Sequence, residues 1–434
     1  MIIILKKIFI KKKNMINYFK KMIETEKGKK IITPQLIIII IYFIIILTSE
    51  CFYRDELFEY SYKNFIPKFQ SITDKYILLK TYFKISSTLG KNIFIFLFNL
   101  IICIIYYSYQ EIFICLSTIF TSVSLMGYLK LIYHSHRPYW HNLYIFNDSN
   151  ELGYGNPSGH SFTSTSGYLS FIFLVLNINF FKKKYFLIDF LNYGIFIINL
   201  LWIFSIMISR LYFAVHSINQ IIFGFLLGIG VFLFYFNYLN LYNYSSEEFF
   251  DFIDDNKSYV IPLIVIYFFS VFIPFNLIKE PSDDIKNLIN EISTVKKPEY
   301  KKFNSEAITG EITILLILGA YLGLIFLKKK IEDTPLTYEA DLILGKNNNN
   351  IKIKIIRFLL CVSFGLPFLL FYIPNYNNNL ILIYICKIGI PYVLSTFFIF
   401  GPGIYYSYMW TSVTIDHRSP SLIERNIISE EKKN

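Results

Sequence analysis

The chain has 434 residues, of which 54% are hydrophobic and 19% aromatic, and this composition excludes a soluble globular domain. The formal net charge is +11, but the lysines cluster beside apolar runs, where lysine sets membrane topology, rather than in a stripe that would bind nucleic acid. The five cysteines are scattered and form no C-x-x-C pair, so neither a disulfide framework nor a zinc site is indicated. We therefore predict an all-α membrane protein.

Residues 1–31 form a basic N-terminus with ten lysines and two glutamates, which the positive-inside rule places in the cytosol. Its lysines follow a very short apolar stretch, and this order argues against a cleavable signal peptide. Residues 32–84 are then expected to hold the first transmembrane anchor and a lumenal amphipathic segment that lies on the membrane surface.

Apolar runs of the length that spans a bilayer recur along the chain. They fall near residues 32–50, 92–108, 112–133, 162–180, 186–208, 217–240, 259–277, 311–327, 355–373 and 380–403. These runs predict a polytopic helical bundle of nine or ten transmembrane spans.

The first motif is a pair of cations, Lys130 and Arg137, seven residues apart. In a helix this spacing is two turns, so both side chains would point the same way and meet on one anion. Pro138 disfavours helix at Arg137, so the span should end there and leave the guanidinium at the interface, where its planar fork can bind phosphate oxygens. Two snorkelling interface cations are the alternative interpretation.

The second motif is Asn156 followed by Pro157, Ser158, Gly159 and His160. Asn156 can cap a helix whose first turn begins at Pro157, which would leave the backbone N–H groups of that turn free for an anion. His160 is then placed to donate a proton to a leaving oxygen. An ordinary capped helix start is the alternative.

The third motif is Arg210 with His216, which straddle the turn between two predicted spans. An imidazole Nε2 can attack phosphorus when its other nitrogen is held in the correct tautomer. Gln220, four residues further on, can hold the ring through its amide oxygen. A structural histidine bonded to Gln220 is the alternative.

Counting spans outward from a cytosolic N-terminus brings Arg137, His160, Arg210 and His216 to the same lumenal or exterior face. Their convergence predicts one phosphate site. Asn147 begins an N-glycosylation acceptor pattern in the loop on that face and is a candidate for modification.

The three motifs, in this order, resemble the signature of the type 2 phosphatidic acid phosphatase and vanadium haloperoxidase superfamily. The resemblance covers about residues 85–240 and implies a six-helix catalytic core there. Over 241–434, the apolar runs predict three or four additional transmembrane helices and a cytosolic C-terminal tail. It implies a nucleophilic His216 that forms a phosphohistidine, and His160 as the general acid. It also implies phosphate-binding roles for Lys130, Arg137, Ser158, Gly159 and Arg210. The resemblance implies that no metal or other cofactor is needed.

Gln220 departs from the pattern, because most of the superfamily has Asp at that place. The glucose-6-phosphatase branch resembles this chain in having Gln there, and in the run Arg137-Pro138-Tyr139-Trp140. The segment that begins at His216-Ser217-Ile218 is similar to the sphingolipid branch, and extra C-terminal spans occur in both branches.

The resulting prediction is a metal-independent membrane phosphatase whose substrate is a lipid phosphate of the phosphatidate or sphingoid-base class. A glucose-6-phosphatase-like sugar phosphatase and a low-activity scaffold relative are the alternatives.

A metal site at His134, His136 and His141 lacks a carboxylate at ligand spacing, and a transporter would place more charges inside its spans. A dilysine-like sequence at Glu431–Asn434 suggests the endoplasmic reticulum.

Overall fold

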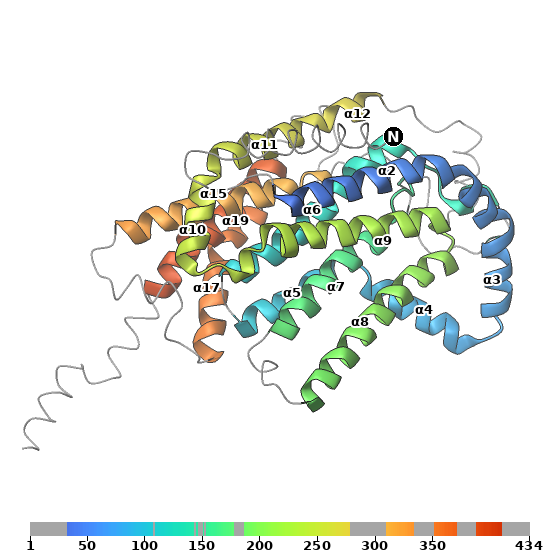
Figure 1. Cartoon of the computed structure of the whole chain (residues 1–434), viewed down its shortest axis with the longest axis horizontal. Helices are drawn as coiled ribbons and strands as arrows, with labels where there is room; N and C mark the ends of the chain where they lie inside the picture. Colours follow the sequence, from blue (N-terminus) through green and yellow to red (C-terminus); the bar gives the residue numbers. More distant parts are fainter. Residues whose placement is uncertain are drawn as a thin grey trace, which may run out of the picture.

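The computed structural model describes residues 33–106, 109–142, 145, 151, 153–177, 186–277, 310–333, 351–370 and 388–409. In these residues the regular secondary structure is entirely helical, and the helices pack into an elongated bundle (Figure 1). Five helical stretches are long and apolar enough to cross a membrane: Pro34–Thr73, Tyr109–Trp140, Tyr193–Tyr212, Ile218–Asn243 and Lys257–Phe275. The prediction of an all-α, multi-pass bundle is confirmed, while the number of nine or ten spans stays a prediction.

The first helix, α2 (Pro34–Tyr60), begins where sequence chemistry predicts a helix start. Thr33 accepts a hydrogen bond from the Leu36 N–H at 3.3 Å and Pro34 occupies the first turn. The chain continues through η1 (Ser61–Phe65) and α3 (Ile66–Thr73) into α4 (Ile77–Leu89). Ile77 and Leu78 of α4 are 78% and 82% exposed, as suits the predicted segment on a membrane surface.

Helix α7 (Gly159–Asn177) lies among α5 (Asn92–Tyr106), α6 (Tyr109–Tyr133), α8 (Phe186–Tyr212) and α9 (Ile218–Leu233). Its first turns carry small polar residues that are fully buried, and small residues let helix backbones approach closely. The approach to α9 is close: a Cβ atom added at Gly224 would lie 2.7 Å from the Ser158 carbonyl oxygen, directly before α7. This packing fixes the start of α9 beside the start of α7.

The C-terminal part adds further helices to this core. They are η4 (Phe234–Leu239), η5 (Leu241–Asn243), α10 (Ser246–Asp255), α11 (Lys257–Ser270), α12 (Phe272–Leu277), α15 (Ile314–Glu332), α17 (Ile351–Leu370), α19 (Ile390–Phe398) and η7 (Ile399–Gly403). Helix α15 packs against α19 and also contacts α6, so the C-terminal helices support the core from the side of α6. The domain boundaries at 84, 240 and 241 stay predictions.

The three sequence motifs lie at one end of this bundle. In Figure 1, α8 and α9 meet at the end that also carries α3 and α4. The last residues of α6 and the first residues of α7 belong to the same end, because Gln220 of α9 bonds both to the loop after α6 and to the residue before α7.

Candidate active site

Arg137 lies in an extended stretch after α6 rather than on the helix itself. Helix α6 ends at Tyr133, His134 has a positive φ of 45°, and Arg137 is extended before Pro138, as a residue before proline should be. The prediction that Lys130 and Arg137 lie two turns apart on one helix is therefore wrong. Lys130 remains in the last turn of α6, half-buried.

The guanidinium of Arg137 is buried rather than at an exposed interface, with 1% of the residue accessible. Its Nε donates to the Gly153 carbonyl at 2.5 Å and Nη1 donates to the Val215 carbonyl at 3.0 Å. These bonds hold the guanidinium in one place beside His216.

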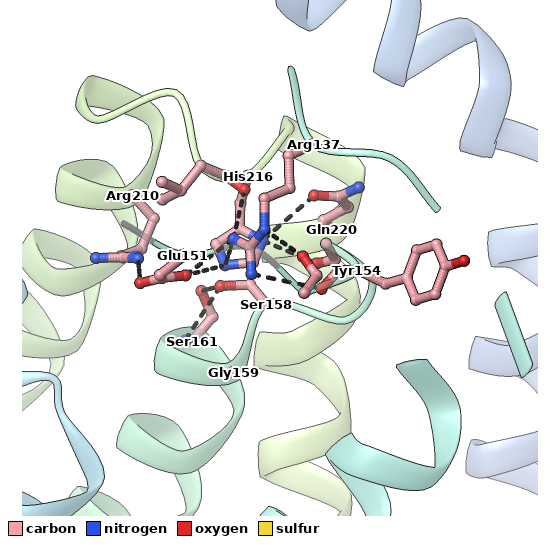
Figure 2. Close-up of polar contacts among 12 residues, drawn as sticks. Arg137, Glu151, Tyr154, Ser158, Gly159, Ser161, Arg210, His216 and Gln220 are labelled. Atoms are coloured by element: carbon pink, nitrogen blue, oxygen red, sulfur yellow. Dashed lines mark hydrogen bonds and ion pairs between the residues drawn. The ribbon is translucent and has the colours of Figure 1, made fainter. Parts of the chain in front are cut away.

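Glu151 joins the two arginines of the site (Figure 2). Arg137 Nη1 donates to Glu151 Oε2 at 2.9 Å, and Arg210 Nη2 binds the other carboxylate oxygen. Arg210 Nη1 also donates to the Ser87 hydroxyl at 2.5 Å. Two buried guanidinium groups thus converge on one anion.

The ionisation of Glu151 follows from these neighbours. Burial alone would raise the pKa of the Glu151 carboxyl, but the charges of Arg210 and then Arg137 outweigh burial and hold that pKa well below its usual value. Glu151 is therefore a carboxylate at neutral pH. The sequence analysis missed this residue.

His216 is oriented by two oxygen atoms on one side of its ring. Its Nδ1 lies 2.8 Å from the Gly155 carbonyl oxygen and 3.3 Å from Gln220 Oε1. Burial, followed by the charge of Arg137, lowers the pKa of His216 well below its usual value, so the ring is neutral. Because a carbonyl oxygen only accepts, we assign the proton to Nδ1, which leaves the lone pair on Nε2.

The unprotonated nitrogen of His216 faces the arginine and carboxylate cluster. Nε2 lies 3.5 Å from Arg137 Nη1 and 3.9 Å from Glu151 Oε2. Any anion that takes the place of the Glu151 carboxylate would therefore meet an imidazole lone pair.

Gln220 contacts His216 as the sequence predicts, but it has further partners. Its Oε1 also accepts from the Ser217 N–H at 3.3 Å, and its Nε2 donates to the His136 carbonyl at 2.8 Å. The Gly155 carbonyl is the closer partner of the imidazole, and it was not visible in the sequence because any residue supplies a carbonyl. Orientation of the ring does not depend on the residue at 220 alone.

The start of α7 differs from the prediction. The helix begins at Gly159, and Ser158 caps it by accepting from the Ser161 N–H at 3.4 Å. The Ser158 N–H is not free, because it donates to the Gln220 carbonyl at 3.0 Å. Within the described residues, the N–H groups of Gly159 and His160 have no hydrogen-bond acceptor. The predicted anion site at this helix start is thus reduced to these two donors and begins two residues later.

His160 lies in the first turn of α7, and its Nε2 has no hydrogen-bond partner in the described part of the chain. Burial, followed by the charge of Arg210, lowers the pKa of His160 to about 3. The charges of Glu151 and Lys130 act on the same pKa, which places this imidazole within electrostatic reach of the cluster.

The other histidines of the first motif form a separate pair. His136 Nδ1 lies 3.0 Å from His141 Nε2, and the two rings are stacked. Among the described residues, no three histidine, cysteine or acidic side chains are grouped as metal ligands. Asn147 lies outside the described residues.

The fold and the site define a multi-pass membrane protein with a buried anion site, made by two arginines beside a neutral histidine. Residues 111–244 match the family model of the PAP2 superfamily, and this range contains all three motifs. This match supports membership of the type 2 phosphatidic acid phosphatase superfamily and suggests phosphatase activity in a membrane protein. No curated protein and no solved structure matches the chain.

Proposed function

We propose that the chain is an integral-membrane phosphomonoesterase that hydrolyses a lipid phosphate through a phosphohistidine at His216. The observation that carries the proposal is the geometry of His216. Its protonated Nδ1 faces two oxygen acceptors, and its Nε2 lone pair faces the anion held by Arg137 and Arg210.

The phosphoryl group of the substrate would bind where the Glu151 carboxylate now lies. Arg137 and Arg210 already converge on that position, and the N–H groups of Gly159 and His160 add donors from the start of α7. A phosphate and the Glu151 carboxylate would repel each other there, so Glu151 moves aside when substrate binds.

In the first step, the Nε2 lone pair of His216 forms the N–P bond while the P–O bond to the alcohol breaks. The charge of the bound phosphate raises the pKa of His160, so this imidazole can carry the proton that the leaving alkoxide takes. The Nδ1–H group stays bonded to the Gly155 carbonyl as positive charge develops on the ring.

In the second step, water attacks the phosphohistidine and gives its proton to the neutral His160. The N–P bond breaks and inorganic phosphate leaves. In both steps the equatorial oxygens carry most of the negative charge, and the fixed cations Arg137, Arg210 and Lys130 are the groups that stabilise it.

A lipid substrate is supported by the position of the site at the ends of the apolar helices. Helix α4, with its exposed Ile77 and Leu78, packs against α8 beside Arg210. A lipid phosphate can approach from the membrane with its headgroup in water, while its chains remain beside such apolar surface.

A sugar phosphate is the second candidate, and one observation favours it. Arg137 and His216 are each 1% exposed, so the phosphate position lies deep behind loops, where a small polar ester fits more easily than a bulky lipid. Gln220, which contacts His216, is also the residue in which the chain resembles the glucose-6-phosphatase branch.

A substrate panel tests both candidates. Membranes that contain the protein are given phosphatidate, sphingosine 1-phosphate, an isoprenyl phosphate and glucose 6-phosphate, with His216→Ala as the inactive control. We expect lipid phosphates to be hydrolysed fastest, EDTA to have little effect and vanadate to compete. His141→Ala is the matched control, because the ring of His141 faces His136 rather than the arginines. Phosphate release that survives in His216→Ala contradicts the assignment.

A further inference from the structure

Glu50 is a buried acidic residue in the second half of α2, outside the range that matches the family. It is 6% exposed, in a helix that the sequence analysis treats only as a membrane anchor. Its Oε1 accepts two hydrogen bonds, from Asn156 Nδ2 at 2.7 Å and from Asn219 Nδ2 at 2.9 Å.

The two asparagines belong to the two halves of the candidate site. Asn156 directly precedes the Pro157–His160 turn, which supplies the free N–H groups and the proposed general acid. Asn219 lies in the first turn of α9, next to Gln220, and its Oδ1 accepts from the Ser217 hydroxyl at 2.6 Å. One carboxylate oxygen of α2 thus ties the start of α7 to the start of α9.

The same stretch of chain makes two further contacts with α9. Ser61, directly after α2, accepts from the Ile218 N–H at 3.0 Å, and the Tyr42 hydroxyl donates to the Leu226 carbonyl at 2.8 Å. Helix α2 therefore runs along α9, and through Glu50 it also contacts the loop that leads into α7. A buried carboxyl group in an apolar helix is costly unless it has partners. Here one partner, Asn156, belongs to the second motif, and the other, Asn219, is the neighbour of Gln220.

We propose that Glu50 is a positioning residue for the phosphatase reaction, one that fixes the distance between the anion-binding start of α7 and the nucleophile His216. The inference rests on the proposed function. A displacement of about 1 Å between reacting groups can lower turnover by about 100-fold, even when the displaced contact is remote from the chemistry. Helix α2 is then part of the catalytic unit.

The test compares three variants of the full chain, purified in detergent and assayed on the best substrate of the panel. Glu50→Ala removes the acceptor, Glu50→Gln keeps an oxygen that can accept both hydrogen bonds, and Glu56→Ala removes an exposed acid of the same helix as a control. We expect Glu50→Ala to lower kcat about 10- to 100-fold with KM changed less than about 3-fold. Glu50→Gln should stay within about 3-fold of wild type.

If Glu50→Ala lowers the yield of folded protein, the inference is tested at the other end of the contact. The variants are then Asn219→Ala and the double variant Glu50→Ala with Asn219→Ala. Because both residues act through one contact, the double variant should lose little more activity than either single variant. Equal kcat in wild type, Glu50→Ala and Asn219→Ala overturns the inference, as does equal loss in the Gln and Ala variants. A wild type that hydrolyses no phosphate ester contradicts the proposed function itself.

Discussion

Two acidic residues, the partly buried Glu151 in the site and the fully buried Glu311 beside α15, have opposite surroundings. Glu151 bonds to two arginines and lies close to His216. Glu311 is 0% exposed, and neither of its carboxyl oxygens has a hydrogen-bond partner among the described residues. At the site, the Glu151 carboxylate is compensated by the opposite charge of two arginines, whereas the carboxyl group of Glu311 has no hydrogen-bond partner among the described residues. The difference indicates that the arginines at the site are arranged to hold an anion, and that Glu151 holds the place of one.

The largest effect is expected from breaking the arginine pair. Arg210→Ala removes half of the anion contact and should lower kcat/KM by about 100- to 1000-fold, because fixed charge no longer meets the transition state. Arg210→Lys should restore little of it, because a single ammonium group cannot replace the planar fork that reaches both Glu151 and Ser87.

Steady-state kinetics on purified protein measure this loss. Lys63→Ala is the control, because Lys63 of η1 is an exposed cation that pairs with Glu59 of α2. Arg210→Ala activity within a few-fold of wild type would show that the arginine cluster does not bind substrate.

Replacement of Glu151 tests the same cluster by removing its anion instead of one of its arginines. In Glu151→Gln the two arginines lose their charged partner, so an added oxyanion no longer competes with a carboxylate for them. We expect the inhibition constant of vanadate to fall about 10-fold, which corresponds to about 1.4 kcal/mol of tighter binding. Glu247→Gln, on the exposed first turn of α10, is the control. Unchanged or weaker inhibition would mean that Glu151 does not occupy the phosphate position.

The pH dependence of stability should report the neutral state of His160. Its pKa is lowered from 6.5 to about 3 in the folded chain, mainly by burial. As pH falls below 6.5, His160 binds a proton in the unfolded chain but not in the folded chain. The contribution of His160 to folding stability is therefore complete above pH 6.5 and is lost progressively toward pH 3. His160→Gln should lose less stability over this window.

Thermal unfolding midpoints of the detergent-solubilised protein, measured between pH 7 and pH 4, supply this comparison. The pKa of His216 is also lowered, so His216 loses stability in the same direction as pH falls. It does so equally in wild type and in His160→Gln, and the difference between their two curves therefore reports His160 alone. Parallel curves would show that His160 is not held neutral by its surroundings.

The smallest effect is expected at Glu311. Glu311→Met removes a buried carboxyl group without a partner and should raise the unfolding midpoint by about 2–4 °C, with kcat unchanged. A lower midpoint would show that the carboxyl group has a stabilising role, and the contrast with Glu151 would then fail.

The convergence of the motifs was predictable from sequence, because charge counting along the spans needs only their order. Of the four side chains expected to converge, Arg137, Arg210 and His216 lie around Glu151, and His160 lies in the first turn of α7 with no hydrogen-bond partner for its Nε2 among the described residues. The lumenal or exterior side of this face stays a prediction. Glu151 was missed because a loop residue has no periodicity to mark it. One signal was present: several buried cations require an anion, and Asp148 and Glu151 are the two acidic residues between Arg137 and Asn156.

The two errors of helix register have different causes. At Pro157 the local rules favour a first helical turn, but Ser158 bonds to Gln220 instead and the helix begins later. At Arg137 the helical spacing from Lys130 was misleading, because Pro138 disfavours helix there and the Arg137 side chain bonds to Gly153 and Val215. Glu50 was missed for a related reason, since its partners lie more than 100 positions away along the chain.

The central claim is that His216 becomes phosphorylated, and a rapid-quench experiment with a substrate carrying ³²P in its phosphoryl group tests it most directly. Wild-type protein should carry label on the peptide that contains His216, stable in alkali and lost in acid, as an N–P bond requires. His216→Ala should carry none. Label on another residue, or label retained in His216→Ala, would contradict the account.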